Sequence, residues 1–147
     1  GKKMKRRTEM YEYADLVRIA KTYYQDKNCC TVVALTHATM LGFGKVFHTM
    51  RRYGRITGKG GWLFNNEELK AELGISTEVV EGHEYWSYQK LGTVSQVVRR
   101  LPKQGAYWLL VRAHIIHVEN GEIMDWVQAN SRRQVTGILK ITREFQA

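Results

Sequence analysis

The chain has 147 residues, and its 23 lysine and arginine residues against 14 aspartate and glutamate residues give a formal net charge of +9. This length favours one domain with a substantial core, since a domain of this size buries roughly 70% of its unfolded surface. A composition of 44% hydrophobic and 25% charged residues is typical of soluble globular proteins. No apolar run approaches the roughly 18 residues of a membrane span, and the N-terminus lacks the apolar core of a signal peptide.

The positive charge is concentrated at the N-terminus, where five of the first seven residues are lysine or arginine. We expect residues 1–8 to form a flexible basic arm and residues 9–147 a single domain. The charge favours nucleic acid or another polyanion as a partner, but solubility accounts for it equally well. The sequence contains no zinc-finger spacing and no RNA-binding aromatic motif.

The first part of the chain predicts three helices. One covers 10–24, because apolar and aromatic residues recur there at spacings of three and four. A second covers about 29–41, with Asn28 as its N-cap and Gly42 ending it, and it is apolar on nearly every side, as in a core helix. A third covers about 44–53.

The middle of the chain combines loops with short helices. The glycine-rich basic stretch 54–61 predicts a plain loop; a phosphate site is the less favoured alternative, because the spacing is not that of a Walker loop. The pairs Asn65/Glu68 and Thr93/Gln96 predict capping boxes of two short helices. Segment 82–92, which holds His83, Tyr85, Trp86 and Tyr88, predicts a loop that lines a cleft.

The rest of the chain predicts strands. Residues 75–79 alternate in polarity, and strands are expected over 106–112, 113–119, 122–127 and 134–143. Helices followed by an antiparallel sheet make an α+β fold.

Asn120-Gly121 between two extended apolar runs is a strong signal for a two-residue hairpin. If these two residues form the turn, Glu119 faces Glu122 and Ile116 faces Asp125. Because alternate residues share a face, His114 and Asp125 then lie as diagonal neighbours, about 7 Å apart at the backbone. A buried carboxylate needs a partner, and His114 is the nearest candidate. His117 points to the opposite face.

Both cysteines of the chain, Cys29 and Cys30, lie in the predicted first turn of the core helix. A helix N-terminus and a neighbouring imidazolium both lower a thiol pKa. Cysteine, histidine and aspartate together suit a thiol nucleophile with a base and an orienting carboxylate. The helix position alone does not decide between the two cysteines. Gln25, just upstream, is a candidate donor to an oxyanion hole.

Two adjacent cysteines are too few for a disulfide framework, so we expect a reducing, cytoplasmic setting. A metal site formed by Cys29, Cys30, His37 and His114 is an alternative with little support, because adjacent cysteines lack the usual zinc-ligand spacing.

The pattern Cys-x-x-x-Ala-Leu at a helix start, followed by Arg-x-His and an Asn-Gly hairpin that ends in aspartate, resembles the papain-like cysteine peptidases. It is most similar to small single-domain members in tailed bacteriophages and to bacteriocin-leader-processing peptidases. The spacing to Ala34 and Leu35 matches Cys30 to the family nucleophile, with Cys29 as second choice. His114 and Asp125 match the family histidine and aspartate.

The chain departs from the family pattern at two positions. Ala113 stands before the histidine, where glycine is common. Gln25 stands five residues before Cys30 rather than six, and Tyr24 holds the usual glutamine position.

The resemblance implies a papain-like α+β fold and a thiol-dependent hydrolase, a peptidase, amidase or isopeptidase, that acts on a protein or peptide without metal or organic cofactor. A phage origin would place it in the host cytoplasm or in the virion. The alternative is a catalytically idle binding protein on the same fold, whose basic surface engages nucleic acid or an acidic host protein.

Overall fold

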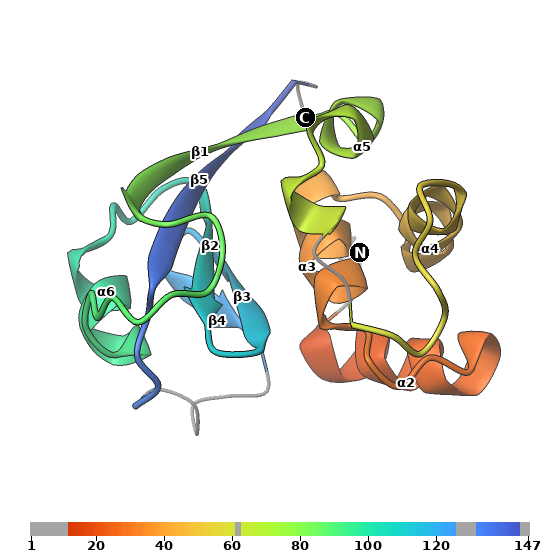
Figure 1. Ribbon diagram of the computed structural model, residues 1–147, viewed down its shortest axis with the longest axis horizontal. Coiled ribbons are helices and arrows are strands. Elements are labelled where there is room, and N and C mark those ends of the chain that lie inside the picture. The colour runs from red at the N-terminus through yellow and green to blue at the C-terminus, as the bar shows by residue number, and fades with distance from the viewer. Residues whose placement is uncertain (1–11, 61–62, 126–131, 145–147) are drawn as a thin grey trace, which may run out of the picture.

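The computed structural model describes residues 12–60, 63–125 and 132–144. Helices precede a five-stranded antiparallel sheet, which confirms the predicted α+β class (Figure 1). The helical elements are α2 (Tyr13–Tyr24), α3 (Cys30–Thr39), α4 (Phe43–Arg52), the 3-10 turn η1 (Leu63–Asn65), α5 (Glu67–Glu72) and α6 (Val94–Arg100). The strands are β1 (Ile75–Gly82), β2 (Ala106–Val111), β3 (His114–Glu119), β4 (Glu122–Met124) and β5 (Gly137–Arg143), in the sheet order β1-β5-β2-β3-β4.

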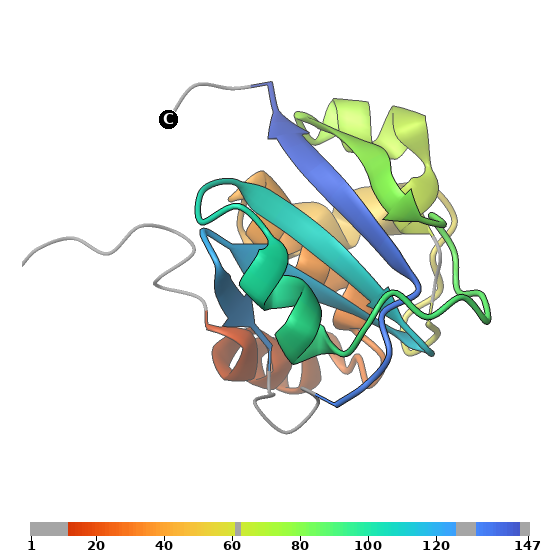
Figure 2. The same ribbon diagram turned by 90° about the vertical axis from the view of Figure 1, so that its left-hand side faces the viewer.

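Helices cover both faces of the sheet. Helix α3 packs against one face, with α2 and α4 beyond it, and α6 covers the other face (Figures 1 and 2). Every residue of the central strand β2 is buried, because alternate side chains face the two layers. Ala106, Trp108 and Leu110 join the cluster around α3, and Tyr107, Leu109 and Val111 join the cluster around α6.

Helix α3 is the core helix that the sequence predicts, with residues 31–39 all buried. Its ends differ from the prediction. Cys29, not Asn28, is the N-cap residue, and the Asn28 side chain donates to the carbonyl oxygen of Gly58 at 2.6 Å. The helix ends before Met40, which adopts a left-handed conformation (φ 60°), and Gly42 is the N-cap of α4 instead.

The two short helices test the predicted capping boxes. The box at Thr93 and Gln96 is confirmed, with reciprocal hydrogen bonds of 3.2 and 2.9 Å. The Asn65/Glu68 box is wrong by one residue, because the Asn66 side chain caps α5 by accepting from the Leu69 amide at 2.9 Å.

The predicted basic arm and part of the predicted strand 122–127 lie outside the described residues. In the part of the chain that is described, no single helix is long and apolar enough to cross a membrane. Helices α3 and α4 pass that test only as a pair, bent by 118°.

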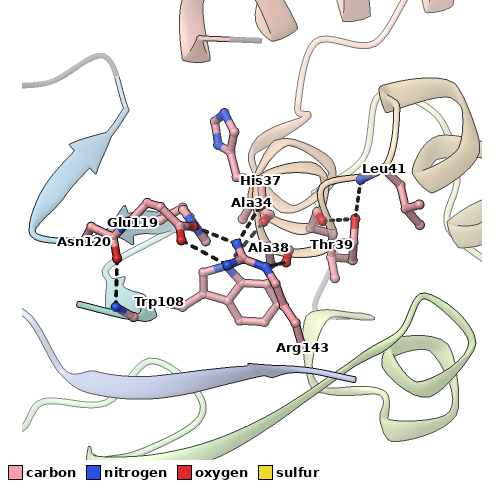
Figure 3. Close-up of polar contacts among 12 residues, drawn as sticks. Ala34, His37, Ala38, Thr39, Leu41, Trp108, Glu119, Asn120 and Arg143 are labelled. Carbon is pink, nitrogen blue, oxygen red and sulfur yellow. Dashed lines mark hydrogen bonds and ion pairs between the residues drawn. The ribbon is translucent and has the colours of Figure 1, made fainter. Parts of the chain in front are cut away.

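Arg143 of β5 anchors the C-terminal end of α3 to the sheet (Figure 3). Its guanidinium donates to the carbonyl oxygens of Ala38 and His37 at 2.7 and 3.2 Å, and these belong to the last turn, which has no helical donors for them. Glu119 of β3 accepts from the same guanidinium at 2.7 and 3.0 Å. The Trp108 indole adds a hydrogen bond of 3.3 Å to the carbonyl oxygen of Ala34.

A buried ion pair fixes the segment that leads into α3. Arg55 and Asp26, whose side chains are 1% and 0% exposed, pair through contacts of 2.6 and 3.0 Å. Arg55 also donates to the carbonyl oxygen of Asn28 at 2.7 Å, and the Gly58 amide donates to Asp26 at 3.1 Å. The glycine-rich stretch therefore holds the start of α3 in place.

We predict that Arg55→Ala lowers the free energy of unfolding by about 3–5 kcal/mol, because it leaves the Asp26 carboxylate buried without its cation. Urea titration followed by circular dichroism measures this. Arg52→Ala is the matched control, since the Arg52–Glu72 pair is exposed and its loss should change stability little. Equal effects of the two substitutions would contradict the role of the buried pair.

Candidate active site

The two cysteines differ sharply in their surroundings. Cys30 is the first residue of α3 and lines an open cavity, whereas Cys29 is 5% exposed and packs in the core. The backbone amides of a first helical turn have no carbonyl partners within the helix, and they carry the positive end of its dipole. No side chain caps α3. The structure therefore presents Cys30, and not Cys29, at an electropositive helix end that faces a cavity.

The predicted hairpin register is confirmed. Asn120 and Gly121 both have positive φ, and Glu119 pairs with Glu122. Asp125 follows directly after β4, and its Oδ2 lies 2.6 Å from Nε2 of His114. The Asp125 side chain is only 1% exposed, so this contact supplies the partner that a buried carboxylate needs.

Cys30 and His114 line the same cavity and each shifts the pKa of the other, so all three predicted residues come together. Because Nε2 of His114 faces Asp125, Nδ1 is the ring nitrogen left for the thiol. Ala113, just before His114, has φ 58°, in the left-handed region that favours glycine. The tight β2–β3 turn therefore holds an alanine in a conformation that glycine would adopt without strain.

The electrostatics favour a charged pair. Burial is the largest single influence on the pKa of Cys30 and raises it, but the hydrogen bond and charge of His114, together with hydrogen bonding to Thr31, hold the pKa below the ordinary thiol value. Burial alone would lower the pKa of His114, but hydrogen bonds with Asp125 and Cys30 raise it to about 9. Between the lowered pKa of Cys30 and pH 9, the site is therefore a thiolate beside an imidazolium. Burial raises the pKa of Cys29 to about 11, which keeps it a thiol.

Tyr13 of α2 completes the surroundings of His114. Its ring meets the imidazole edge-on, with centroids 6.3 Å apart and planes at 85°. Burial, followed by the nearby Asp125 and the two thiols, raises the pKa of Tyr13 far above its ordinary value, so the phenol stays neutral. The sequence places Tyr13 on a buried helix face but does not indicate its contact with His114.

A cavity of about 560 Å³ opens onto Cys30 and His114. Its walls are mainly apolar and come from α3, from the 3-10 turn, from the end of β2, and from the aromatic loop 83–92. The lining includes Phe64, Trp86, Leu110 and Ile115. The predicted role of that loop in lining a cleft is confirmed for Tyr85 and Trp86. Asn28 and Asn65 are the amide side chains in the lining.

Gln25, the predicted oxyanion donor, is not part of this cavity lining. It ends α2 in a left-handed conformation (φ 50°), is exposed, and donates back to the carbonyl oxygen of Thr22 at 3.3 Å. Tyr24 also points elsewhere, into a cluster with Phe43 and Phe47. Donors in the cavity lining include the backbone amide of Cys30 and the Asn28 side chain, which uses one of its two N–H groups on Gly58.

The residues of the metal alternative do not come together. His37 is buried against His117, with ring centroids 5.6 Å apart, at the end of α3 that is remote from Cys30. Across the described residues, no three His, Cys, Asp or Glu side chains are arranged to hold a metal ion.

Comparisons of the chain with protein-family models, with curated proteins and with solved structures find no match.

We predict that iodoacetamide labels Cys30 rapidly at pH 7 and that His114→Ala slows the labelling at least about tenfold. Without His114, burial dominates and the thiol pKa rises to or above its ordinary value of about 8.5. Intact-mass spectrometry against pH measures the rates. Cys29→Ser is the matched control and should change nothing, because the Cys29 pKa is about 11. Labelling that is indifferent to His114 would contradict the charged pair.

Proposed function

We propose that this protein is a thiol-dependent hydrolase of peptide or amide bonds, with Cys30 as nucleophile, His114 as general acid and base, and Asp125 as the residue that orients His114. The observation that carries the proposal is the chain of contacts from Cys30 to His114 to the buried Asp125. Thiolate and imidazolium at one end of a cavity are the starting state that such chemistry needs.

The reaction follows from the geometry. The Cys30 thiolate attacks the substrate carbonyl carbon, and the C–S bond forms as the carbonyl electron pair moves to oxygen. The Cys30 backbone amide, with Asn28 as second donor, stabilises that oxyanion. The imidazolium of His114 gives its proton to the amine nitrogen, and the C–N bond breaks to leave a thioester.

Water then completes the cycle. His114, now neutral, takes a proton from a water molecule as the water oxygen attacks the thioester carbonyl. The C–S bond breaks, the acid product leaves, and the thiolate–imidazolium pair is restored. Asp125 keeps Nδ1 of the ring toward the sulfur throughout and stabilises the imidazolium.

The arrangement also supports the papain-like assignment proposed from the sequence. A nucleophile at the first turn of a buried helix, packed on an antiparallel sheet that carries the histidine at a strand start, is what the resemblance implies. The largely apolar cavity favours a substrate with an apolar side chain near the cleaved bond.

We predict that the protein cleaves members of a mixed library of internally quenched peptides, with products identified by mass spectrometry. Cys30→Ala and His114→Ala should each lower kcat/KM at least about a thousandfold, because nucleophile and base act as one unit. Cys29→Ser should keep full activity and serves as the control for loss of a thiol. Full activity of Cys30→Ala on a cleaved peptide would overturn the proposal.

A further inference from the structure

A second cavity, of about 320 Å³, adjoins the first and shares Trp86 with it. Its lining differs in character, because it holds three basic side chains, Lys90, Arg112 and Arg133, beside Trp86 and Tyr88. Among the described residues that line it, none is acidic. None of the three basic residues forms an ion pair with a carboxylate in the described part of the chain.

The backbone holds this basic cavity in a fixed relation to the catalytic residues. Arg112 lies two residues before His114, in the same tight turn, and its guanidinium stacks over the Trp86 ring with 5.6 Å to the centroid. Arg133 donates a hydrogen bond to the Arg112 carbonyl oxygen, which ties the segment after the hairpin to that turn. Whatever occupies the basic cavity is therefore placed at a defined distance from Cys30.

The aromatic loop that walls both cavities is anchored at its two ends. The His83 amide donates to Thr136 at 3.2 Å, and the Leu91 amide donates to Val135 at 2.9 Å. Gly137 allows the loop to approach, because a Cβ added there would lie 1.8 Å from the His83 carbonyl oxygen. Between these anchors the loop exposes Trp86 and Tyr88.

We propose that the basic cavity is a specificity subsite for an acidic side chain of the peptide substrate. An aspartate or glutamate there would meet cations that have no carboxylate partner within the described chain, while a neighbouring apolar residue fills the cavity at Cys30. The substrate class is thus a peptide with an acidic residue close in sequence to the apolar residue at the cleaved bond. This inference rests on the proposed hydrolase function.

The test measures peptide binding without turnover. The full-length Cys30→Ser variant is titrated against fluorescein-labelled octapeptides that carry one central leucine. In one series a single Glu is placed at each of the other positions in turn, and in the matched series its neutral isostere Gln takes the same position. Fluorescence anisotropy gives each Kd. At one position we expect Glu to bind about fivefold more tightly than Gln, which corresponds to one partly exposed charge pair.

The charge-removing variant Arg112→Gln/Lys90→Gln should abolish the preference for Glu, and so should high salt. The matched control is Arg99→Gln/Arg100→Gln on α6, which removes the same charge outside both cavities and should keep the preference. A Glu-to-Gln ratio near one at every position, or equal loss in the control, would overturn the subsite. Tighter binding of a single-stranded oligonucleotide that competes with every peptide would also overturn it, in favour of nucleic acid.

Failure of the subsite proposal can be told apart from failure of the proposed hydrolase function. Iodoacetamide labelling of the parent protein measures the reactivity of Cys30. Whether Cys30 reacts rapidly does not depend on Arg112 or Lys90. Fast labelling with no Glu preference would leave the hydrolase proposal intact and remove only the subsite.

Discussion

The position of α3 is the constraint on which the rest of the structure depends. At its C-terminal end, Arg143 donates to the carbonyl oxygens of His37 and Ala38 and, through Glu119, joins them to β3. At its N-terminal end, the Asp26–Arg55 pair locks the incoming chain to the following loop. A buried ion pair of this kind contributes little net stability compared with apolar packing, but it tolerates very few alternative geometries. These contacts therefore fix the position of Cys30 relative to β3, the strand that begins at His114.

The charges in the site depend on one another. Burial on its own would leave a protonated thiol and a neutral imidazole, which is an unreactive pair. The buried Asp125 favours the charged pair, because it stabilises the imidazolium, and the imidazolium in turn stabilises the thiolate. Tyr13 of α2 meets the His114 ring edge-on. The start of α3 and the β3–β4 hairpin, far apart in the chain, thus produce a charged pair that neither would hold alone.

Local signals allowed the key part of the site to be predicted. The two-residue turn at Asn120-Gly121 fixes the register in which β3 and β4 pair. That register brings Asp125 next to His114. The apolar character of α3 and the Thr93 capping box are equally local, and both predictions were confirmed.

The features that the sequence did not reveal arise from contacts between distant segments. Asn28 has the right side chain to cap α3, but Cys29 is the N-cap residue, and the Asn28 amide donates to Gly58, thirty residues away. Gln25 itself ends α2 in a left-handed conformation and is exposed, which propensity alone does not predict. Arg55 occurs in a stretch typical of an exposed basic loop, yet it is only 5% exposed, because it forms a buried ion pair with Asp26. The basic cavity likewise needs three separate segments to form.

The measurement that tests this account most directly is a pH titration of the His114 ring by NMR, with histidines labelled and His114 assigned by its substitution. We expect the ring to stay protonated up to a pKa of about 9, and the pKa to be lower in Cys30→Ala and in Asp125→Asn, since each substitution removes one of the two partners that raise it. A His114 pKa near the ordinary 6.5 in the parent protein, unmoved by either substitution, would contradict the account.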